Sequence, residues 1–565
     1  MSLQTKGLAL RVTKGALIAL LMSSAATAAL AAPKHKHVVK AAAADPRDAK
    51  LEALEQEVSA MRAEMAQLRA AQSGDHGEAK VAALQQQLAD TNAQLTDVKA
   101  AQVADASDIS TLKAPAVVPS LPNGKLALAS SDGRFTANMR AIIMFDAGKY
   151  FQKSNLPAQV TNRDLNDGTN FRRARFGIDG KLFKDFDYAV IYEFGGSGGE
   201  DAGHIQEIWA QYTALKPWKI RIGAFEPNIG LAAAVSTSQM PLMERPAAAE
   251  VARNVAAGDS RSAIQVFGNG LWGDGDAGIA TRWFASGAIT GNTVGTINSS
   301  NTVNTATPAT VVVGTLQPSD EQVAIIGRFA IAPFSSTDWQ THFGVNAQYV
   351  LQPNNLSVGT AYPVQLRDRP ELRIDGTRLV DTGGIDARHV TVLGAEAGLT
   401  VQNFMLESEY FSYRIDRRNA TNAPVFASDP NFSGWYVQGA WVLTGEPRPY
   451  NPAEARFDAP KMAYNFNPAA GTWGTWELVG RYSNLDLNYH DCGAGHAIPA
   501  AGVSCFDAVR GGEQKISTIG LNWYLNPDIR FMLDYQFVDV SRFNAAGLQV
   551  GQKYNALALR SQLAF

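Results

Sequence analysis

From residue 134 to residue 565 the chain alternates apolar and polar side chains in segments of roughly 8–14 residues. This two-residue period predicts β-strands that have one apolar and one polar face. Such segments are long enough to cross a bilayer at a tilt. The pattern contains sixteen of them, near 134–145, 171–182, 187–195, 205–214, 218–226, 261–268, 276–290, 321–332, 339–350, 388–400, 404–415, 433–444, 474–486, 514–524, 529–540 and 554–565.

The connections between these segments alternate in length. Short turns lie at 183–186, 215–217, 333–338, 402–403 and 525–528. Long loops include 146–170, 227–260, 291–320, 351–387 and 487–513. Short turns on one side and long loops on the other are typical of an outer-membrane barrel, and an even strand number places both chain ends on the periplasmic side. The connection 445–473 departs from this pattern, because it is long where a short turn is expected.

Hydrocarbon cannot hydrogen-bond a free strand edge, so a sheet in a membrane must close on itself. We therefore predict an all-β fold, a sixteen-stranded antiparallel transmembrane β-barrel preceded by a short N-terminal coiled-coil helix. The last segment agrees with this prediction, because Leu557, Leu559 and Leu563 share one face and the chain ends at Phe565. A soluble β-sandwich is the competing fold, but it would not need such regular loop asymmetry.

The segment 173–182 indicates which face is which. Its apolar face carries Ala174, Phe176, Ile178 and Leu182, and its polar face carries Arg173, Arg175, Asp179 and Lys181. A charge on the lipid face at the bilayer midplane costs roughly 2–4 kcal/mol, so the charged face is expected to point inward. Arg221 alternates with Ile220 and Ile222 in the same way. A barrel of this size leaves an aqueous channel, because side chains cannot fill it.

The N-terminal residues 1–31 are typical of a signal peptide. Lys6, Arg11 and Lys14 precede a short apolar run, Gly15–Met22, and small residues follow. Residues 32–45 are rich in Ala, Lys and His and are expected to form a flexible leader. No run of eighteen apolar residues occurs after the N-terminus, so a helical membrane protein is not expected.

Residues 46–112 carry apolar side chains three and four residues apart, which predicts a coiled coil. A narrow amphipathic helix is marginal alone in water, so self-association is expected, with packing against the barrel as the alternative. We expect the segment in the periplasm, with contact to the cell wall as an alternative role. Residues 113–133 contain Pro115, Pro119 and Pro122 and are predicted to be a stiff linker to the barrel at 134–565.

The composition narrows the possible chemistry. The net charge of −3 gives no sign of nucleic-acid binding. The two cysteines, Cys492 and Cys505, lie in a Gly- and Ala-rich loop, and an exported protein is expected to join them in a disulfide. A metal site with His490 and His496 is the less favoured reading. The eight histidines are scattered and no nucleophile motif appears, so no enzyme and no cofactor are predicted.

Several blocks of the barrel resemble the phosphate-selective porin O/P family. They are FRRARFGIDGKLFKDFDYAVIYEF at 171–194, RPELRIDGTRLVDTG at 369–383, GWYVQGAWVLTGEPRPY at 434–450, GLNWYLNPDIRFMLDYQFVDV at 520–540 and the ending ALALRSQLAF. The resemblance covers roughly 130–565. It implies a sixteen-stranded homotrimeric porin with an inward-folded constriction loop and a basic eyelet, and it accounts for the long connection at 445–473.

Basic residues on the inward face are the candidate anion-binding residues of the pore. Arg172, Arg173 and Arg175 match the basic strand motif of the family, and Lys181 and Arg221 share the inward face. The loop 227–260 is the candidate constriction, with Arg245, Arg253 and nearby Arg261, but also Glu244 and Glu250. Guanidinium forks match phosphate oxygens, which favours oxyanions. Pairing with carboxylates such as Asp179, Asp187 and Glu193 to brace the wall is the alternative role.

The predicted function is an outer-membrane porin of a Gram-negative bacterium that passes small anions, phosphate or related oxyanions, through a basic constriction. A general or carbohydrate-type porin, or a tether between outer membrane and cell wall, are the alternatives. The expected partners are inorganic phosphate or other small anions, outer-membrane lipid and two further copies of the chain.

Overall fold

The computed structural model describes residues 46–70, 75–113, 117–121, 125–152, 164–195, 203–258, 260–273, 281–294, 302–303, 311–312, 320–336, 338–355, 362–419 and 425–565. The predicted signal peptide at 1–31 and the leader at 32–45 lie outside these residues. The chain divides into two units, Met1–Ala114 and Pro115–Phe565, which are taken separately.

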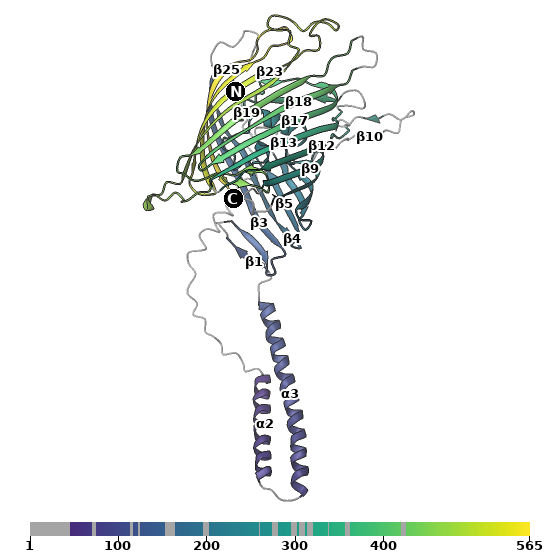
Figure 1. The fold of residues 1–565 in the computed structure, drawn as a ribbon, viewed down its shortest axis with the longest axis vertical. Coiled ribbons are helices and arrows are strands. Elements are labelled where there is room, and N and C mark those ends of the chain that lie inside the picture. Colours follow the sequence, from purple (N-terminus) through teal and green to yellow (C-terminus); the bar gives the residue numbers. More distant parts are fainter. Residues whose placement is uncertain are drawn as a thin grey trace, which may run out of the picture. The chain divides into compact units, whose positions relative to one another are not determined.

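The second unit is a closed antiparallel barrel of sixteen strands (Figure 1). Each strand pairs with its neighbours along the chain, and the last strand pairs with the first. Strand number and order are as predicted. The strands are β3 (Thr136–Gln152), β4 (Gly168–Leu182), β5 (Phe186–Glu193), β6 (His204–Tyr212), β7 (Trp218–Phe225), β8 (Arg261–Trp272), β9 (Thr281–Thr293), β12 (Val323–Ala332), β13 (Trp339–Gln352), β17 (Ile385–Val401), β18 (Phe404–Arg417), β19 (Asn431–Val442), β22 (Thr475–Tyr489), β23 (Val509–Tyr524), β24 (Ile529–Ser541) and β25 (Lys553–Ala564).

The two faces of the barrel wall follow the predicted alternation. On β4, Phe176 is 50% exposed and Ile178 is 41% exposed, whereas Arg173 is 3% exposed. On β13, Phe343 and Val345 face outward and His342 is fully buried. The outer wall is therefore apolar and the charged side chains point into the barrel, as a membrane-spanning barrel requires.

Aromatic side chains gather at the short-turn end of the wall. Trp272 and Trp283 stack with ring centroids 5.9 Å apart, and Trp218 lies 5.6 Å from Trp283. Trp476 stacks on Trp523 at 5.1 Å on the strands β22 and β23. Such a girdle is typical of the level where a bilayer meets water.

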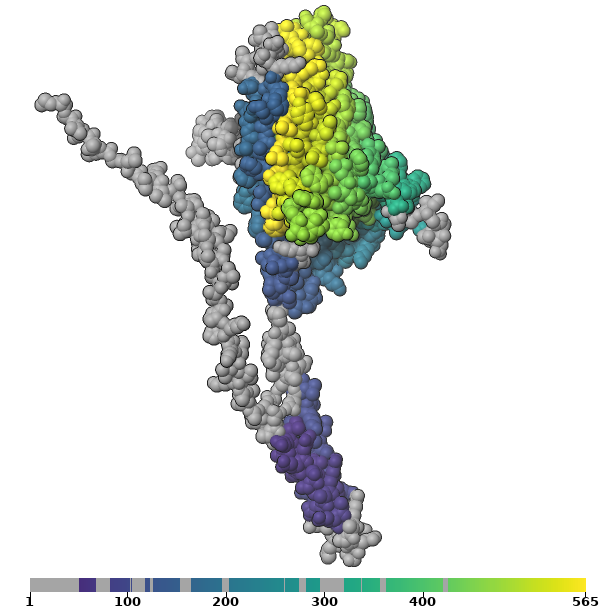
Figure 2. Space-filling view, turned by 90° about the vertical axis from the view of Figure 1, so that its left-hand side faces the viewer, coloured from purple at the N-terminus to yellow at the C-terminus, as the bar shows by residue number. Residues whose placement is uncertain are grey.

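The seam of the barrel joins β25 to β3. Their pairing runs from Tyr554 opposite Gln152 to Ala564 opposite Ile142. Figure 2 shows the yellow C-terminal strands beside the blue first strands along this wall. On the inner side, the Arg560 guanidinium donates to both Asp146 oxygens at 2.7 Å, so a buried ion pair crosses the seam.

The stretch 113–133, predicted to be a stiff linker, contains two short strands that the sequence analysis did not predict. β1 (Val117–Ser120) pairs with β2 (Ala127–Ser130), and β2 pairs with the first residues of β3. The two valines of β1 favour a strand, and Pro119 is tolerated because β1 is an edge strand. The sheet thus continues past the barrel rim next to the last residue, Phe565.

The described residues of the first unit form two helices, α2 (Pro46–Ala70) and α3 (Asp75–Lys113). They pack on each other through Met61, Met65 and Leu84, and the Lys99 ammonium lies 2.8 Å from a Glu55 carboxylate oxygen. The predicted apolar seam is therefore used within one chain, and association between copies stays a prediction. Among the described residues, no helix is long and apolar enough to cross a membrane.

The connections carry further short elements. Cys492 and Cys505 are joined by a disulfide in the β22–β23 connection. The other elements are α4 (Leu231–Ala234), α5 (Ala247–Ala256), β10 (Thr302–Val303), β11 (Val311–Val312), β14 (Pro363–Val364), β15 (Arg367–Asp368), β16 (Val380–Asp381), β20 (Tyr450–Asn451), β21 (Arg456–Phe457) and η3 (Pro468–Ala470).

Candidate functional site

The connection between β7 and β8, residues 226–260, lies inside the barrel, and we call it the constriction loop. The Glu409 carboxylate on β18 accepts hydrogen bonds from the backbone N–H of Leu231 at 2.7 Å and of Ala232 at 2.9 Å. The Tyr413 hydroxyl donates to the Ala248 carbonyl at 2.6 Å. Inward side chains of the wall thus supply hydrogen-bond partners for backbone N–H and carbonyl groups of the loop. These bonds hold the loop across the lumen.

Gly230 lets the constriction loop approach the wall at the start of α4. Its φ is +120°, a backbone conformation that residues with a side chain rarely adopt. A Cβ atom here would lie 2.5 Å from a Glu409 carboxylate oxygen. The position therefore requires glycine for both backbone conformation and space.

Glu244 of the constriction loop is surrounded by four arginines. Its carboxylate accepts from Arg172 at 2.8 and 3.2 Å and from Arg560 at 2.8 Å. Arg173 and Arg373 lie 3.9 and 3.8 Å away. Burial alone would raise the pKa of Glu244, but the arginines hold it well below its usual range. The carboxylate is therefore ionised and fastens the loop to β4 and β25.

A β-bulge turns both Arg172 and Arg173 toward the lumen. Arg173 pairs with Met144 on β3 and Phe171 pairs with Phe145, so Arg172 is the extra residue between them. Strict alternation would place Arg172 on the lipid face with Ala174. The bulge removes that conflict, because both guanidinium groups reach Glu244.

Arg245 and Arg253 bind acceptors within the constriction loop and so stabilise its fold. Arg245 donates to the carbonyls of Ala232 and Val235, at 3.1 Å each. Arg253 donates to the Glu250 carboxylate at 2.9 and 3.0 Å, and its Nη1 lies 3.5 Å from Glu226. Both predicted eyelet arginines thus lie at the constriction, but with protein acceptors.

Two of the predicted basic residues brace the wall. Arg175 on β4 donates from Nε to Glu193 on β5 at 2.7 Å. Lys181 donates to Asp187, its cross-strand partner, at 2.6 Å. These pairs match the alternative role considered from the sequence.

A second connection lies between β13 and β17, and its described residues 353–355 and 362–384, which we call the β13–β17 loop, also fold inward. The Glu371 carboxylate accepts hydrogen bonds from Arg481 and, at 2.6 Å, from the Ser483 hydroxyl on β22. It also accepts from the Ala247 N–H at 3.3 Å, which links the two loops. Only one inward loop was predicted from the sequence, and this second one was missed.

The unusually long connection between β19 and β22 enters the barrel from the short-turn end. Arg328 on β12 donates to the Glu454 carbonyl at 3.0 Å. Arg456 donates to the Ala234 carbonyl at the end of α4. The constriction loop is thus contacted from both ends of the barrel by inward-folded chain.

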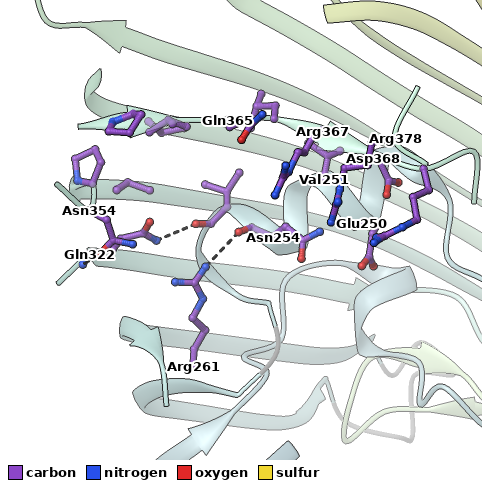
Figure 3. Close-up of a pocket in the computed structure, with 18 of the residues that line it drawn as sticks. Glu250, Val251, Asn254, Arg261, Gln322, Asn354, Gln365, Arg367, Asp368 and Arg378 are labelled. Atoms are coloured by element: carbon purple, nitrogen blue, oxygen red, sulfur yellow. Dashed lines mark hydrogen bonds between the residues drawn. The ribbon is translucent and has the colours of Figure 1, made fainter. Parts of the chain in front are cut away.

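A first cavity of about 330 Å³ lies between the constriction loop and the β13–β17 loop, toward the long-loop end. Figure 3 shows Arg367, Asp368 and Arg378 near Glu250 at one end, and Gln322 with Asn354 at the other. The lining contains five arginines, namely Arg261, Arg367, Arg369, Arg373 and Arg378, and two carboxylates, Glu250 and Asp368. Of the predicted residues, only Arg261 belongs to this set; its Nη2 donates to the Asn254 carbonyl at 3.2 Å.

A second cavity of about 270 Å³ lies on the other side of the constriction loop, toward the short-turn end. It is lined by five arginines, Arg140, Arg175, Arg221, Arg245 and Arg456, and three carboxylates, Glu207, Glu226 and Glu454. Arg221 stacks on the Trp209 ring, with its guanidinium carbon 4.3 Å from the centroid. Its Nε donates to the Gln211 side chain at 2.9 Å.

A closed sixteen-stranded barrel with an apolar outer wall and basic cavities around inward-folded loops defines an outer-membrane porin. The chain belongs to the phosphate-selective porin O and P family, whose model matches residues 151–565. This is a family of channels rather than of enzymes. Within the described residues, no group of three or more His, Cys, Asp or Glu side chains could hold a metal ion.

Comparison with individual proteins gives more distant matches. Porin O of Pseudomonas aeruginosa is 23% identical over 447 residues, which cover 76% of this chain and 88% of that protein. The anion-selective porin from Comamonas acidovorans is 11% identical with a TM-score of 0.40, covering 76% of this chain and all of that one. The outer membrane channel DcaP of Acinetobacter baumannii is 11% identical with a TM-score of 0.39, covering 77% and 99%.

Proposed function

We propose that the barrel passes small anions, phosphate or related oxyanions, by passive diffusion through the two basic cavities that flank the constriction loop. The observation that carries the proposal is the excess of arginines over carboxylates in both linings, five against two and five against three. Family membership supports the same conclusion.

The mechanism is electrostatic. Low-dielectric walls focus the field of the lining charges, so a cavity with excess arginine concentrates anions and repels cations. The planar guanidinium fork presents donors that match the oxygens of phosphate, which partly replaces the water that the ion loses. Two cavities in series provide separate weak sites, and weak sites let an ion leave as well as enter.

Reversal potentials in planar bilayers test the proposal. With a potassium chloride gradient across the purified protein, we expect the sign that marks anion preference. Inorganic phosphate added to both sides should then reduce the chloride current in a saturable manner. Cation preference would refute the anion function, and anion preference without phosphate block would favour a general porin.

We also infer from the family resemblance that the protein assembles as a homotrimer in outer-membrane lipid, so conductance should appear in groups of three steps. The unit of α2 and α3 is proposed to lie in the periplasm, because an even number of strands returns both ends of the barrel to the same side. There it is available for self-association or for contact with the cell wall.

A further inference from the structure

Arg253 lies between the two cavities. It is 4% exposed. Its Nε and Nη2 donate to Glu250, which lines the first cavity, and its Nη1 lies 3.5 Å from Glu226, which lines the second. A chain of carboxylate, guanidinium and carboxylate therefore runs from one cavity to the other.

Glu250 is also held from the opposite side. Arg373 of the β13–β17 loop donates from Nη2 to Glu250 Oε1 at 2.6 Å. Burial alone would raise the pKa of Glu250, but Arg253 and Arg373 keep it well below its usual range. Burial would likewise lower the pKa of Arg373, and Glu250 with Glu244 raises it instead. The Glu250 carboxylate and the Arg373 guanidinium are therefore both charged at neutral pH.

The Glu250 carboxylate takes the position that a dissolved oxyanion would take. It presents two oxygens to guanidinium donors from two different loops. The cavity has four further lining arginines, Arg261, Arg367, Arg369 and Arg378. Phosphate presents oxygens to such forks in the same way. Chloride, a single atom, cannot replace two separate oxygens.

We propose that Glu250 is an internal occupant of this arginine site, which a permeating oxyanion replaces at Arg253 and Arg373 as it moves between the cavities. The inference rests on the proposed anion function. Exchange with a tethered carboxylate weakens the binding of the oxyanion, which keeps the site from trapping it. The same exchange favours oxyanions over halides, so Glu250 determines specificity as well as affinity.

The test is phosphate block of the chloride current through the full-length E250Q channel. Glutamine keeps the shape of the side chain but loses the charge and one acceptor oxygen. We expect the half-blocking concentration of inorganic phosphate to fall about tenfold, the change that corresponds to one lost charge-assisted hydrogen bond. The matched control is D187N, which neutralises a carboxylate paired with Lys181 on the wall and should leave the block within about twofold of wild type.

Each outcome decides the matter. If the wild-type channel prefers anions but phosphate block in E250Q is unchanged or weaker, the proposal is overturned. Glu250 then only holds the two loops together. A wild-type channel without anion preference instead refutes the proposed function. If E250Q does not insert or conduct, E226Q decides in its place, because it releases the same Arg253 from the second cavity and should shift the block in the same direction.

Discussion

Neutralising Glu244 should loosen the constriction loop. In E244Q the side chain keeps one acceptor oxygen, but its amide NH₂ group meets guanidinium donors. The native carboxylate accepts three hydrogen bonds of 2.8–3.2 Å from Arg172 and Arg560 and is 6% exposed. Removing one partner of such a buried ion pair costs about 3–5 kcal/mol. We expect the free energy of unfolding to fall by that amount.

Two measurements check this expectation. Guanidinium unfolding in detergent micelles, followed by tryptophan fluorescence, gives the change in stability, and single-channel recordings should show brief closures as the loop leaves the wall. The control is D539N, which removes an exposed pair with Lys553 and should cost no more than about 1 kcal/mol. An E244Q protein with wild-type stability and a quiet current would refute the anchoring role of Glu244.

The remaining predictions concern pH, the disulfide and the helices. Burial raises the pKa of Asp368 to about 7, against the opposing effect of Arg373 and with Glu250 adding to the rise. Acidification from pH 8 to pH 6 should therefore neutralise a carboxylate of the first cavity and increase anion preference in reversal potentials, and D368N should abolish that dependence. The Cys492→Ser variant should make its loop more sensitive to limited proteolysis without altering conductance, since the disulfide closes a short loop worth about 3 kcal/mol of entropy. Deletion of residues 46–113 should leave single-channel conductance unchanged, and a changed conductance would give the helices a role in the pore.

The strand pattern was readable from the sequence because lipid imposes it. On β4 an inward Arg175 and an outward Phe176 are the only inexpensive arrangement, and the same rule applies wherever a strand alternates regularly. Sixteen strands and their order followed from that rule. The two short strands at Val117–Ser120 and Ala127–Ser130 were missed, because they lie among prolines and outside the lipid constraint.

The candidate site was less predictable, because it is built from contacts distant in sequence. Glu244 meets Arg560 over a separation of 316 positions, which no local pattern reveals. A signal existed for Arg560 itself, since it alternates with the outward Leu557 and Leu559. For Arg172 the signal was its match to the family's basic strand motif, because strict alternation points it outward and only the bulge turns it inward. No signal existed for the inward course of the β13–β17 loop around Arg373.

The ion pair between Asp146 and Arg560 joins positions 414 residues apart. A barrel whose first strand must pair with its last cannot exist in part within the membrane. Any incomplete sheet would leave two unpaired strand edges in hydrocarbon. Pairing of β25 with β3 is therefore the step that completes the barrel during insertion. Contacts between residues so far apart in sequence also make folding slow. The unpaired strand edges therefore stay exposed for longer before the barrel closes.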